Sequence, residues 1–336
     1  MKRDERRQLR TPCGLLMCVA SFLVLLLVVA AGEAADPSAG YPSRPIEYVS
    51  HSKSGAHMVI AQLLSDIIEK EKLLSQPVVC VEKPGSGGAK AQAYLFERKG
   101  NPHLVLGVGT TNFICGPLLS KLPFTYKSFT PICNTCVDGS VLVVRSNSPF
   151  KTINDLIAEA KKRPKELIQG GSSFTSNEGM MGRSMQQLKG VQWNFLSSKS
   201  EGEALLNVLS GDVHFAMLNP AEIIDHVGAG KLRVLLAASP MRYSEFKDTP
   251  TMAEAGLGIP LVTYRGIVGP PDMPDYAAKK LEAVFKKAKE HDRFKKYIKD
   301  SLMQPFWLSS DEYSKLLDKL GDEYKVILKE LNLLKN

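Results

Sequence analysis

Short apolar runs alternate with amphipathic stretches along the chain. One amphipathic stretch, from Met58 to Glu69, has apolar residues at the three- and four-residue spacing that is typical of a helix. The apolar runs around it have the length and the Val/Ile/Leu content of buried strands, and they occupy residues 46–49, 77–81, 104–107 and 141–145. Strands that alternate with helices in this way predict βαβ units with parallel sheets.

The second half of the chain continues this pattern. Thr152 is placed to cap a helix that runs through Ala160. The chain later ends in two amphipathic helices rich in Lys and Glu, and no internal repeat or low-complexity tract stands out. The sequence therefore predicts two α/β lobes, with the C-terminal helices returning to the first lobe. Further strands are predicted over residues 167–168, 215–218, 232–238 and 262–268.

Residues 1–34 have the pattern of an export signal. Residues 1–10 are basic, residues 14–31 carry no charge, and small residues follow, with Gly32 and Ala34 at the two positions that a signal peptidase reads. The uncharged run is long for a signal peptide and close to the shortest segment that spans a bilayer. A cleaved signal peptide and a retained N-terminal anchor therefore both fit. In either case we expect the remaining chain in the periplasm or at the extracytoplasmic face of the membrane.

Composition narrows the class of protein. The 336 residues are 44% hydrophobic and 23% charged, with a formal net charge of +8. These values exclude a disordered, collagen-like or coiled-coil chain, and the length allows two hydrophobic cores. Six cysteines are too few for a disulfide scaffold. Cys133 and Cys136 form a CxxC pair in a strand-like stretch, which favours buried apolar thiols over a redox site. A disulfide among Cys80, Cys115, Cys133 and Cys136 stays open.

The sequence contains no recognisable catalytic or metal-binding motif. The stretch at residues 84–90 lacks the spacing of a phosphate-binding loop, and neither GxSxG nor HExxH occurs. The six histidines are not spaced as metal ligands. Lysines between Lys279 and Lys296 are interleaved with acidic residues, as on a solvated helix face rather than a nucleic-acid-binding surface. We therefore expect no enzyme activity, no cofactor, no metal and no nucleic-acid partner.

Several short segments, taken in order, resemble one protein family. They are YPSRPI (41–46), VCVEKPGSGG (79–88), LPF (122–124) with FTPI (129–132), EALLNVLSGDV (203–213), GKLRVL (230–235), TPTMAEAG (249–256) and GIVGPP (266–271). Over about residues 41–336 the chain is similar to the Bug-type (TctC-like) substrate-binding proteins of tripartite tricarboxylate transporters. The resemblance implies the fold class α/β, a type II periplasmic-binding-protein fold with two α/β lobes joined by two crossover strands and a ligand cleft between them. Residues 41–140 plus 265–336 would form lobe 1, and residues 141–264 would form lobe 2.

The resemblance also implies a function. Proteins of this family capture a small carboxylate, such as a di- or tricarboxylate, an amino acid or an aromatic acid, and deliver it to a small and a large membrane subunit without catalysis. They typically hold the ligand through loop amides, hydroxyls and waters rather than through a salt bridge. We expect the same of this chain, acting as a monomer. Two alternatives use the same fold. One is a ligand-sensing domain that stays on its N-terminal anchor and serves a signalling partner, and the other is an exported hydrolase.

Four turns that lead from a strand into a helix are the candidate ligand-binding segments. The start of a helix presents unpaired N–H groups and the positive end of the helix dipole, and both favour a bound anion. Facing turns from two lobes would hold both ends of a dicarboxylate. The turns at residues 52–57, 109–112, 171–176 and 197–198 also match the cleft loops of the family. The candidate ligand-binding residues are Ser52, Lys53, Ser54, Gly55, Ala56, His57, Thr110, Thr111, Asn112, Gly171, Ser172, Ser173, Thr175, Ser176, Ser197, Ser198, Asn219 and Tyr264.

Two of these turns depart from the family pattern. The first loop of the family reads PGGGTD with an Arg four residues later, whereas this chain has KSGAHM at residues 53–58 and Gln62 at the Arg position. Ser197 and Ser198 stand where the family has Pro-Tyr. The fold is unaffected, but the usual ligand is put in question. We therefore predict that Lys53 contacts an acidic ligand directly.

Overall fold

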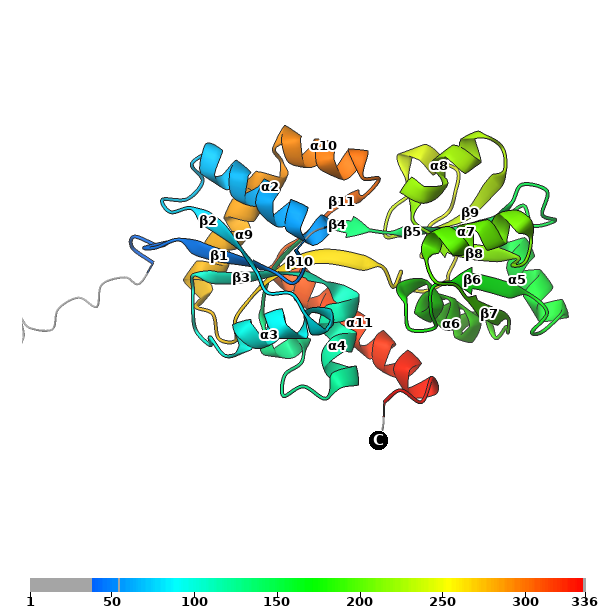
Figure 1. The fold of residues 1–336 in the computed structure, drawn as a ribbon, viewed down its shortest axis with the longest axis horizontal. Helices are drawn as coiled ribbons and strands as arrows, with labels where there is room; N and C mark the ends of the chain where they lie inside the picture. Colours follow the sequence, from blue (N-terminus) through cyan, green and yellow to red (C-terminus); the bar gives the residue numbers. More distant parts are fainter. Residues whose placement is uncertain (1–37, 54, 335–336) are drawn as a thin grey trace, which may run out of the picture. The chain divides into compact units, whose positions relative to one another are not determined.

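Two β-sheets, each with helices on both faces, make up the described chain from Pro42 onward (Figure 1). The computed structural model describes residues 38–53 and 55–334. The predicted export signal at residues 1–34 and the candidate residue Ser54 lie outside the described residues. Within the described residues, no helix combines the length and the apolar character needed to cross a membrane.

The six-stranded sheet has the strand order β11-β4-β10-β3-β1-β2. Its three parallel strands are adjacent to one another, and its other three strands pair in antiparallel fashion. The parallel strands are β1 (Ile46–Ser50), β2 (Val78–Glu82) and β3 (Leu104–Gly109), and the antiparallel strands are β4 (Thr130–Asp138), β10 (Thr263–Gly269) and β11 (Gln304–Leu308).

Helices cover both faces of the six-stranded sheet (Figure 1). One face carries α2 (Ala56–Lys70), α9 (Asp275–Lys289) and α10 (Asp292–Asp300), which contact one another. The other face carries α3 (Ala89–Phe96), α4 (Thr110–Ser120) and α11 (Ser310–Glu330). Short 3-10 turns, η1 (Ser86–Gly88) and η2 (Tyr126–Ser128), precede α3 and β4.

The five-stranded sheet has the order β7-β6-β8-β5-β9. Side chains that alternate along β5 enter two separate cores, because successive residues of a strand point to opposite faces. Val141 and Val143 pack with α7 and α8, whereas Leu142 and Val144 pack with α5 and α6. The elements are β5 (Ser140–Arg145), α5 (Ile153–Lys162), β6 (Ile168–Gly171), α6 (Asn177–Lys189), β7 (Asn194–Ser197), α7 (Glu201–Ser210), β8 (Phe215–Leu218), α8 (Pro220–Gly228) and β9 (Leu232–Ala238).

The chain crosses between the two sheets twice. Gly139 alone separates β4 from β5, and residues 239–262, which include η3 (Ser244–Phe246), connect β9 to β10. The two crossings lie beside each other, since Asp138 pairs with Thr263 in one sheet and Ser140 with Ala238 in the other. A Cβ atom at Gly139 would lie 2.4 Å from the Tyr243 hydroxyl oxygen, so only glycine fits this crossing without a local shift. These crossings agree with the two crossover strands expected for the fold.

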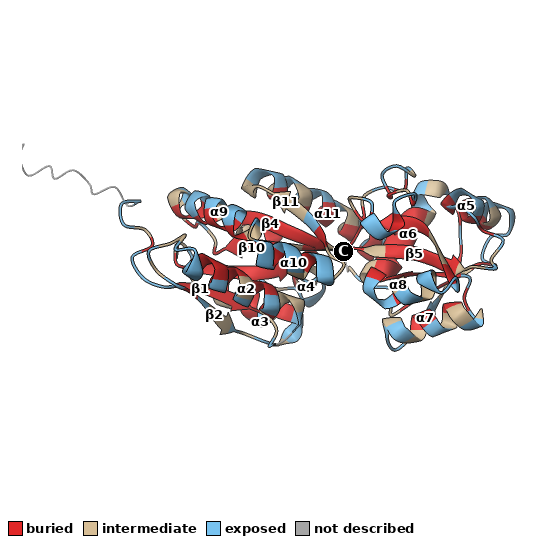
Figure 2. Cartoon of the chain, turned by 90° about the horizontal axis from the view of Figure 1, so that it is seen from above, coloured by how far each residue is buried: buried red, intermediate tan, exposed pale blue. Residues whose placement is uncertain are grey.

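Burial follows the expected division, with strands and inner helix faces buried and outer helix faces exposed (Figure 2). The predicted strands and the helix from Met58 to Glu69 are confirmed, with small differences in their ends. Thr152 caps α5 as predicted, because its side chain accepts a hydrogen bond from the Asp155 N–H. Cys133 and Cys136 are buried free thiols in β4, and the described cysteines Cys80 and Cys115 are free as well.

Two expectations about the architecture are wrong. The sheets are mixed rather than parallel, because the strands next to the crossings run antiparallel to their neighbours. The C-terminal part contains three helices and a strand rather than two helices. His291 divides the predicted first helix, since its ring accepts a hydrogen bond from the Arg293 N–H and starts α10. Leu302, with a positive φ, then ends that segment and precedes β11.

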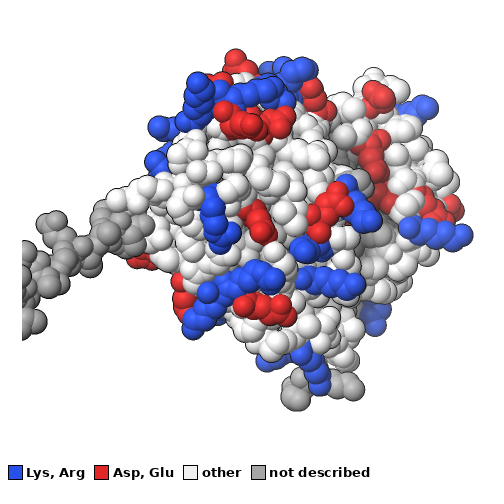
Figure 3. All heavy atoms as spheres, turned by 60° about the vertical axis from the view of Figure 1, so that its left-hand side comes forward, with Lys and Arg blue, Asp and Glu red and all other residues white. Residues whose placement is uncertain are grey.

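Basic and acidic side chains are mixed on the face of the molecule drawn in Figure 3, and the lysine-rich segment near the C-terminus has acidic partners. Lys295 lies 2.9 Å from Glu290, and Lys296 lies 2.7 Å from Asp300. This arrangement is that of a solvated helix face, as the sequence predicted.

Candidate functional site

The helices that follow β1, β2 and β3 begin without side-chain caps. Their N-caps are Gly55, Gly88 and Gly109, and none of the three helices has an acidic residue in its first turn. The positive ends of α2, α3 and α4 are therefore not neutralised by their own sequences. Of the candidate residues, Gly55, Ala56 and Thr110 lie directly at these helix starts.

Two histidines from the first turn lie against each other. The ring centroids of His51 and His57 are 4.2 Å apart. Gly109 leaves room for this pair, since a Cβ atom there would lie 3.1 Å from the His57 Nε2 atom. Burial, followed by the positive charge of Arg265 and by His51, lowers the pKa of His57 to about 2. His57 is therefore neutral at ordinary pH and offers a hydrogen-bonding ring rather than a charge.

Arg265, in β10, is the charged side chain next to these histidines. Its guanidinium donates from Nη2 to Asp138 Oδ2 at 2.5 Å, and its side chain is 10% exposed. Its Nε and Nη1 atoms make no hydrogen bond with the described residues. The same holds for two buried atoms of the first turn, His51 Nε2 and Ser52 Oγ. A buried guanidinium with unused donors is suited to bind a further anion, and a carboxylate matches its geometry best.

The sequence reasoning missed Arg265. The available signal was a lone charge in the otherwise apolar and polar-neutral run from Val262 to Val268. Its neighbour Tyr264, a candidate residue, is buried with its hydroxyl 3.4 Å from the Pro260 carbonyl and its ring beside Phe306. Neighbouring residues of a strand face opposite sides of the sheet, so the side chains of Tyr264 and Arg265 lie on opposite faces of the six-stranded sheet.

The helices that follow β6, β7 and β8 begin differently. Ser176, Ser200 and Asn219 cap α6, α7 and α8 through side-chain oxygens, and each first turn is acidic. Glu178 is buried and accepts hydrogen bonds from both the N–H and the hydroxyl of Ser172. These helix ends are neutralised by the chain itself.

Asn219 forms hydrogen bonds with residues from both sheets' surroundings, Asp138 in β4 and Glu201 in α7. Its side-chain amide donates to Asp138 Oδ1 at 3.1 Å, and its backbone N–H lies 3.4 Å from Glu201 Oε2. A continuous polar path therefore runs from Arg265 through Asp138 and Asn219 to Glu201. Burial, with further contributions from Glu178 and Glu222, raises the pKa of Glu201 to about 7.

A second polar contact connects the sheets through Thr111. Its hydroxyl donates to Asn177 Oδ1, and Asn177 Nδ2 donates to Thr263 Oγ1 at 3.0 Å. Tyr324 of α11 also lies 3.2 Å from the Thr111 hydroxyl. Thr110 contacts the end of the segment that connects β9 to β10, since its hydroxyl donates to the Val262 carbonyl at 3.0 Å.

The remaining candidate residues lie less centrally. Ser173 and Thr175 contact each other at 3.2 Å on the surface, and Ser198 accepts a hydrogen bond from Asn207. Lys53, Asn112 and Ser197 are exposed, and Lys53 forms no ion pair with the described residues. Gly171 ends β6, where a Cβ atom would meet Phe195 and Glu178. The structure therefore brings together the candidates at His57, Thr111, Ser172 and Asn219 with the unpredicted Arg265, Asp138, Glu178 and Glu201.

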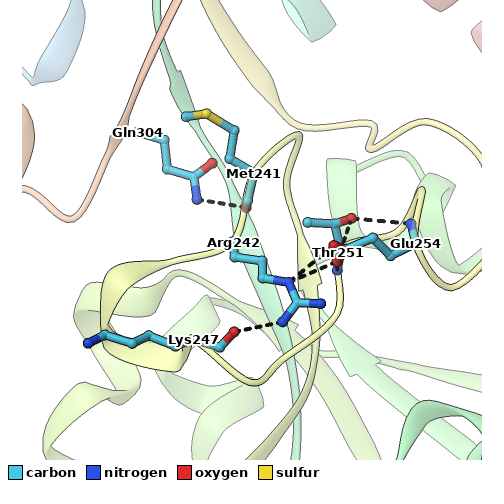
Figure 4. A network of polar contacts seen from close by, with 6 residues as sticks. All are labelled: Met241, Arg242, Lys247, Thr251, Glu254 and Gln304. Carbon is cyan, nitrogen blue, oxygen red and sulfur yellow. Dashed lines mark hydrogen bonds and ion pairs between the residues drawn. The ribbon is translucent and has the colours of Figure 1, made fainter.

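A groove of about 460 Å³ lies elsewhere, between α10, residues 241–245 and the start of β11. Figure 4 shows how its edge is held: Gln304 Nε2 donates to the Met241 carbonyl at 2.9 Å, and Arg242 contacts Glu254 and the Lys247 carbonyl. Three of the four cations that line it contact an acidic side chain: Arg242 contacts Glu254, and Lys289 and Lys295 both contact Glu290. These three therefore offer a bound anion less unused charge than the buried Arg265 does.

Similar proteins of known structure share this fold. A TctC solute binding protein from Polaromonas matches with a TM-score of 0.80 and 23% identity, over 86% of this chain and 99% of that chain. MatC from Rhodopseudomonas palustris, solved with bound malate, matches with a TM-score of 0.59 and 19% identity, over 86% of this chain and 100% of that chain. An R. palustris protein solved with adipate has a TM-score of 0.62 and 19% identity, over 86% of this chain and 97% of that chain.

Relatives are found by sequence as well. A Cupriavidus necator protein, "UPF0065 protein in gbd 5'region", is 28% identical over 98% of this chain and 99% of its own length. Protein BugT of Bordetella pertussis is 29% identical over 69% of this chain and 72% of its own length. The family described as "Tripartite tricarboxylate transporter family receptor" matches residues 60–333. Since this match spans most of the chain, the protein belongs to the TctC family of solute-binding receptors, as the sequence resemblance implied.

Proposed function

We propose that this protein captures a small carboxylate between the two sheets and delivers it to the small and large membrane subunits of a tripartite transporter. The observation that carries the proposal is Arg265, a buried guanidinium with two unused donor atoms beside the uncapped starts of α2 and α4. Charge-assisted hydrogen bonds between a carboxylate and such a group are roughly twice as strong as hydrogen bonds between neutral groups. No step of catalysis is needed for this role.

Binding would use groups from both sheets. The ligand carboxylate accepts hydrogen bonds from Arg265 Nε and Nη1, and the neutral rings of His51 and His57 bound it on the side of α2. Asn177 and Asn219 approach from the second sheet. Rotation about the crossings at Gly139 and residues 239–262 would open and close the site. We accordingly propose two lobes, residues 41–140 with 265–336 and residues 141–264, in a monomeric protein of the periplasm or extracytoplasmic membrane face.

Relatives support the ligand class. MatC is described with bound malate, and another R. palustris protein with adipate, and both ligands are dicarboxylates. Both proteins share the fold of this chain at low sequence identity, so they favour the class of ligand rather than its identity.

The experiment is thermal unfolding of the purified protein against a panel of di- and tricarboxylates, aromatic acids and amino acids. A ligand that binds only the folded state stabilises it by about 2.7 kcal/mol at a hundredfold excess over the Kd. We expect at least one acid to raise the Tm, in proportion to the logarithm of its concentration. If mass spectrometry shows that the protein is free of ligand and no acid raises the Tm, the proposed function is wrong.

A further inference from the structure

We propose that the groove between α10, residues 241–245 and the start of β11 is a second binding site, which takes an amphipathic monocarboxylate. The alkyl chain lies along the buried face of α10, and the carboxylate lies beside Lys299. This inference goes beyond the proposed function, because the lining of the groove includes neither Arg265 nor any of the described candidate residues. It follows from the size of the groove, its buried apolar side chains and the uneven charge of its walls.

The groove has the size of a small-molecule site. Its volume is about 460 Å³, and small-molecule sites usually have roughly 300–1,000 Å³. Its lining comes from three parts of the chain that are far apart in sequence: residues 241–245, residues between 289 and 305, and Thr135 of β4. A concave site formed jointly by several elements has the usual geometry of a ligand pocket.

Apolar side chains make up most of the buried lining. Phe294 and Ile298 are four positions apart, so they lie on the same face of α10, and both are buried. Leu302 and the half-buried Met241 and Met303 extend this apolar surface. Methionine side chains are flexible and adapt to the shape of what they contact. The surface is therefore suited to an alkyl chain.

The buried polar side chains of the lining do not need a ligand. Gln304 Nε2 donates to the Met241 carbonyl at 2.9 Å (Figure 4), and the Thr135 hydroxyl donates to a carbonyl of β10 at 2.9 Å. The Tyr243 hydroxyl lies at the crossing, where it leaves no room for a Cβ atom at Gly139. The polar end of a ligand is therefore held by the charged residues of the groove.

Lysines give the α10 side of the groove a net positive charge. Lys289, Lys295 and Lys299 line this side together with one acidic residue, Glu290. Lys289 and Lys295 both contact Glu290, whereas Lys299 is exposed and forms no ion pair with the described residues. Lys299 is therefore the cation that is free to contact the carboxylate of a ligand.

The opposite wall does not attract an anion. Arg242 there contacts Glu254, and Glu245 forms no ion pair with the described residues. A second carboxylate on the ligand would lie either near Glu245 or on the apolar surface, and both positions are unfavourable. A cationic head group would be repelled by Lys299. The groove therefore selects an alkyl chain with one negative group.

The test uses octanoate, hexanoate and octylammonium as probes in calorimetric titrations of the ligand-free protein. Octylammonium has the same chain as octanoate and the opposite charge, and we expect it to bind at least tenfold more weakly. Hexanoate should bind about tenfold more weakly than octanoate, because it lacks two CH₂ groups and each buried CH₂ changes affinity about fourfold.

Met303→Glu places a charge on the apolar surface, and we expect it to weaken octanoate binding at least tenfold. Val326→Glu is the matched control, because Val326 is a 51% exposed apolar residue of α11 outside the groove. It should bind octanoate within twofold of the wild type. Circular dichroism and the Tm show whether each variant is folded.

Substitutions of surface charges test where the carboxylate lies. At low ionic strength, Lys299→Gln should weaken octanoate binding about threefold, since exposed charge pairs contribute little. Lys296→Gln makes the same change on α10, but Lys296 contacts Asp300 and does not line the groove, so the affinity should be unaltered. Glu245→Gln should strengthen binding about twofold, because it removes a repulsion.

The outcomes separate this inference from the proposed function. Octanoate binding that persists within twofold in Arg265→Gln supports the second site, whether or not any acid of the panel binds at Arg265. If Arg265→Gln weakens octanoate binding as much as Met303→Glu does, octanoate occupies the Arg265 site; the inference is then overturned while the proposed function stands. The inference is also overturned if octanoate does not bind, if octylammonium binds equally well, or if Met303→Glu and Val326→Glu bind octanoate equally.

Discussion

The helices that begin at the ends of β1, β2 and β3 differ from those that begin at the ends of β6, β7 and β8. The first three start at glycine, with no side-chain cap and no acid in the first turn. The second three start at Ser or Asn caps, each followed by one or two glutamates. In both sets, a strand that pairs in parallel with a neighbour leads into a helix.

This difference shows that the side chains, not the fold, decide what a helix start attracts. An uncapped start leaves N–H groups and a positive potential for a ligand, whereas a capped acidic start neutralises that potential and leaves excess negative charge. The helix starts of the six-stranded sheet are therefore the ones suited to an anion. Asp138 and Glu201 are the charged residues that contact Asn219, and Arg265 contacts Asp138.

The largest effect is expected from Arg265→Gln. Loss of the buried guanidinium removes the charged anchor, and we expect the affinity for the bound acid to fall about 100-fold, since a truncated buried charge pair costs about 2–5 kcal/mol. Calorimetric titration measures this change. The control is Arg293→Gln, which breaks an exposed contact with Asp66 at 3.4 Å and should leave affinity unaltered. Equal affinities in the two variants would contradict the role of Arg265.

Asn219→Ala tests the residue that contacts both Asp138 and Glu201. It removes the cap of α8 and the hydrogen bond to Asp138, and we expect a loss of about 2 kcal/mol in the free energy of unfolding. Ser200→Ala removes only a cap, that of α7, and should cost about 1 kcal/mol. Urea denaturation gives both values. If Asn219→Ala costs no more than Ser200→Ala, the contact with Asp138 contributes nothing to stability.

The raised pKa of Glu201 predicts a pH dependence of stability. Because its folded pKa of about 7 exceeds the unfolded value of 4.5, the folded state binds more protons between these pH values, and its stability falls as pH rises through this window. The wild type should therefore lose on the order of 2 kcal/mol relative to Glu201→Gln between pH 5 and pH 7.5. Urea denaturation of both proteins at each pH gives the difference. Parallel pH curves would show that Glu201 does not titrate in this way.

Ala56→Asp gives α2 the acidic start that α6, α7 and α8 already have. The new carboxylate near Arg265 and the His51–His57 pair would compete with the ligand, and we expect about a tenfold loss of affinity, equivalent to about 1.4 kcal/mol. The Tm should be unchanged or slightly higher, because the acid improves the helix start. Ala56→Asn matches the size without the charge and should bind almost normally. A similar loss in both variants would indicate a steric cause.

The smallest effect is expected from Lys53→Ala. Lys53 is exposed, so its attraction for an acidic ligand is screened by water and salt, and we expect about a threefold loss of affinity at low ionic strength. The loss should disappear in concentrated salt. Lys247→Ala, an exposed lysine away from the first turn, serves as the control. An unaltered affinity at low salt would show that Lys53 does not contribute to ligand binding.

Local sequence predicted the elements and the position of the turns well. The strand runs, the helix from Met58 and the Thr152 cap depend on nearest neighbours and on a period of two or 3.6 residues, which a single sequence displays. The division of the basic C-terminal segment into α9 and α10 was missed, because a histidine cap is a weak signal inside a helical pattern. The direction of β4, β10 and β11 depends on where the chain crosses between sheets, and periodicity does not report it.

The candidate site was only partly predictable, for the same reason. Glycine, Ser and Thr in the turns marked residues 52–57, 109–112 and 171–176 as helix starts. The contact between Arg265 and Asp138 could not be predicted from the sequence, because the two residues are 127 positions apart and meet only after β4 and β10 pair. Glu178 and Glu201 look in the sequence like ordinary first-turn acids, and only the burial of Glu178 and the partial burial of Glu201 distinguish them.

The most direct test is a crystal structure of the protein with the tightest-binding acid of the panel. We expect the ligand between the two sheets, with a carboxylate oxygen within hydrogen-bond distance of Arg265 Nε or Nη1, about 2.7–2.9 Å, and with contacts from Asn177 or Asn219. A ligand seated elsewhere, for example in the groove between α10 and β11, with Arg265 contacting Asp138 alone, would contradict the assignment of the binding site.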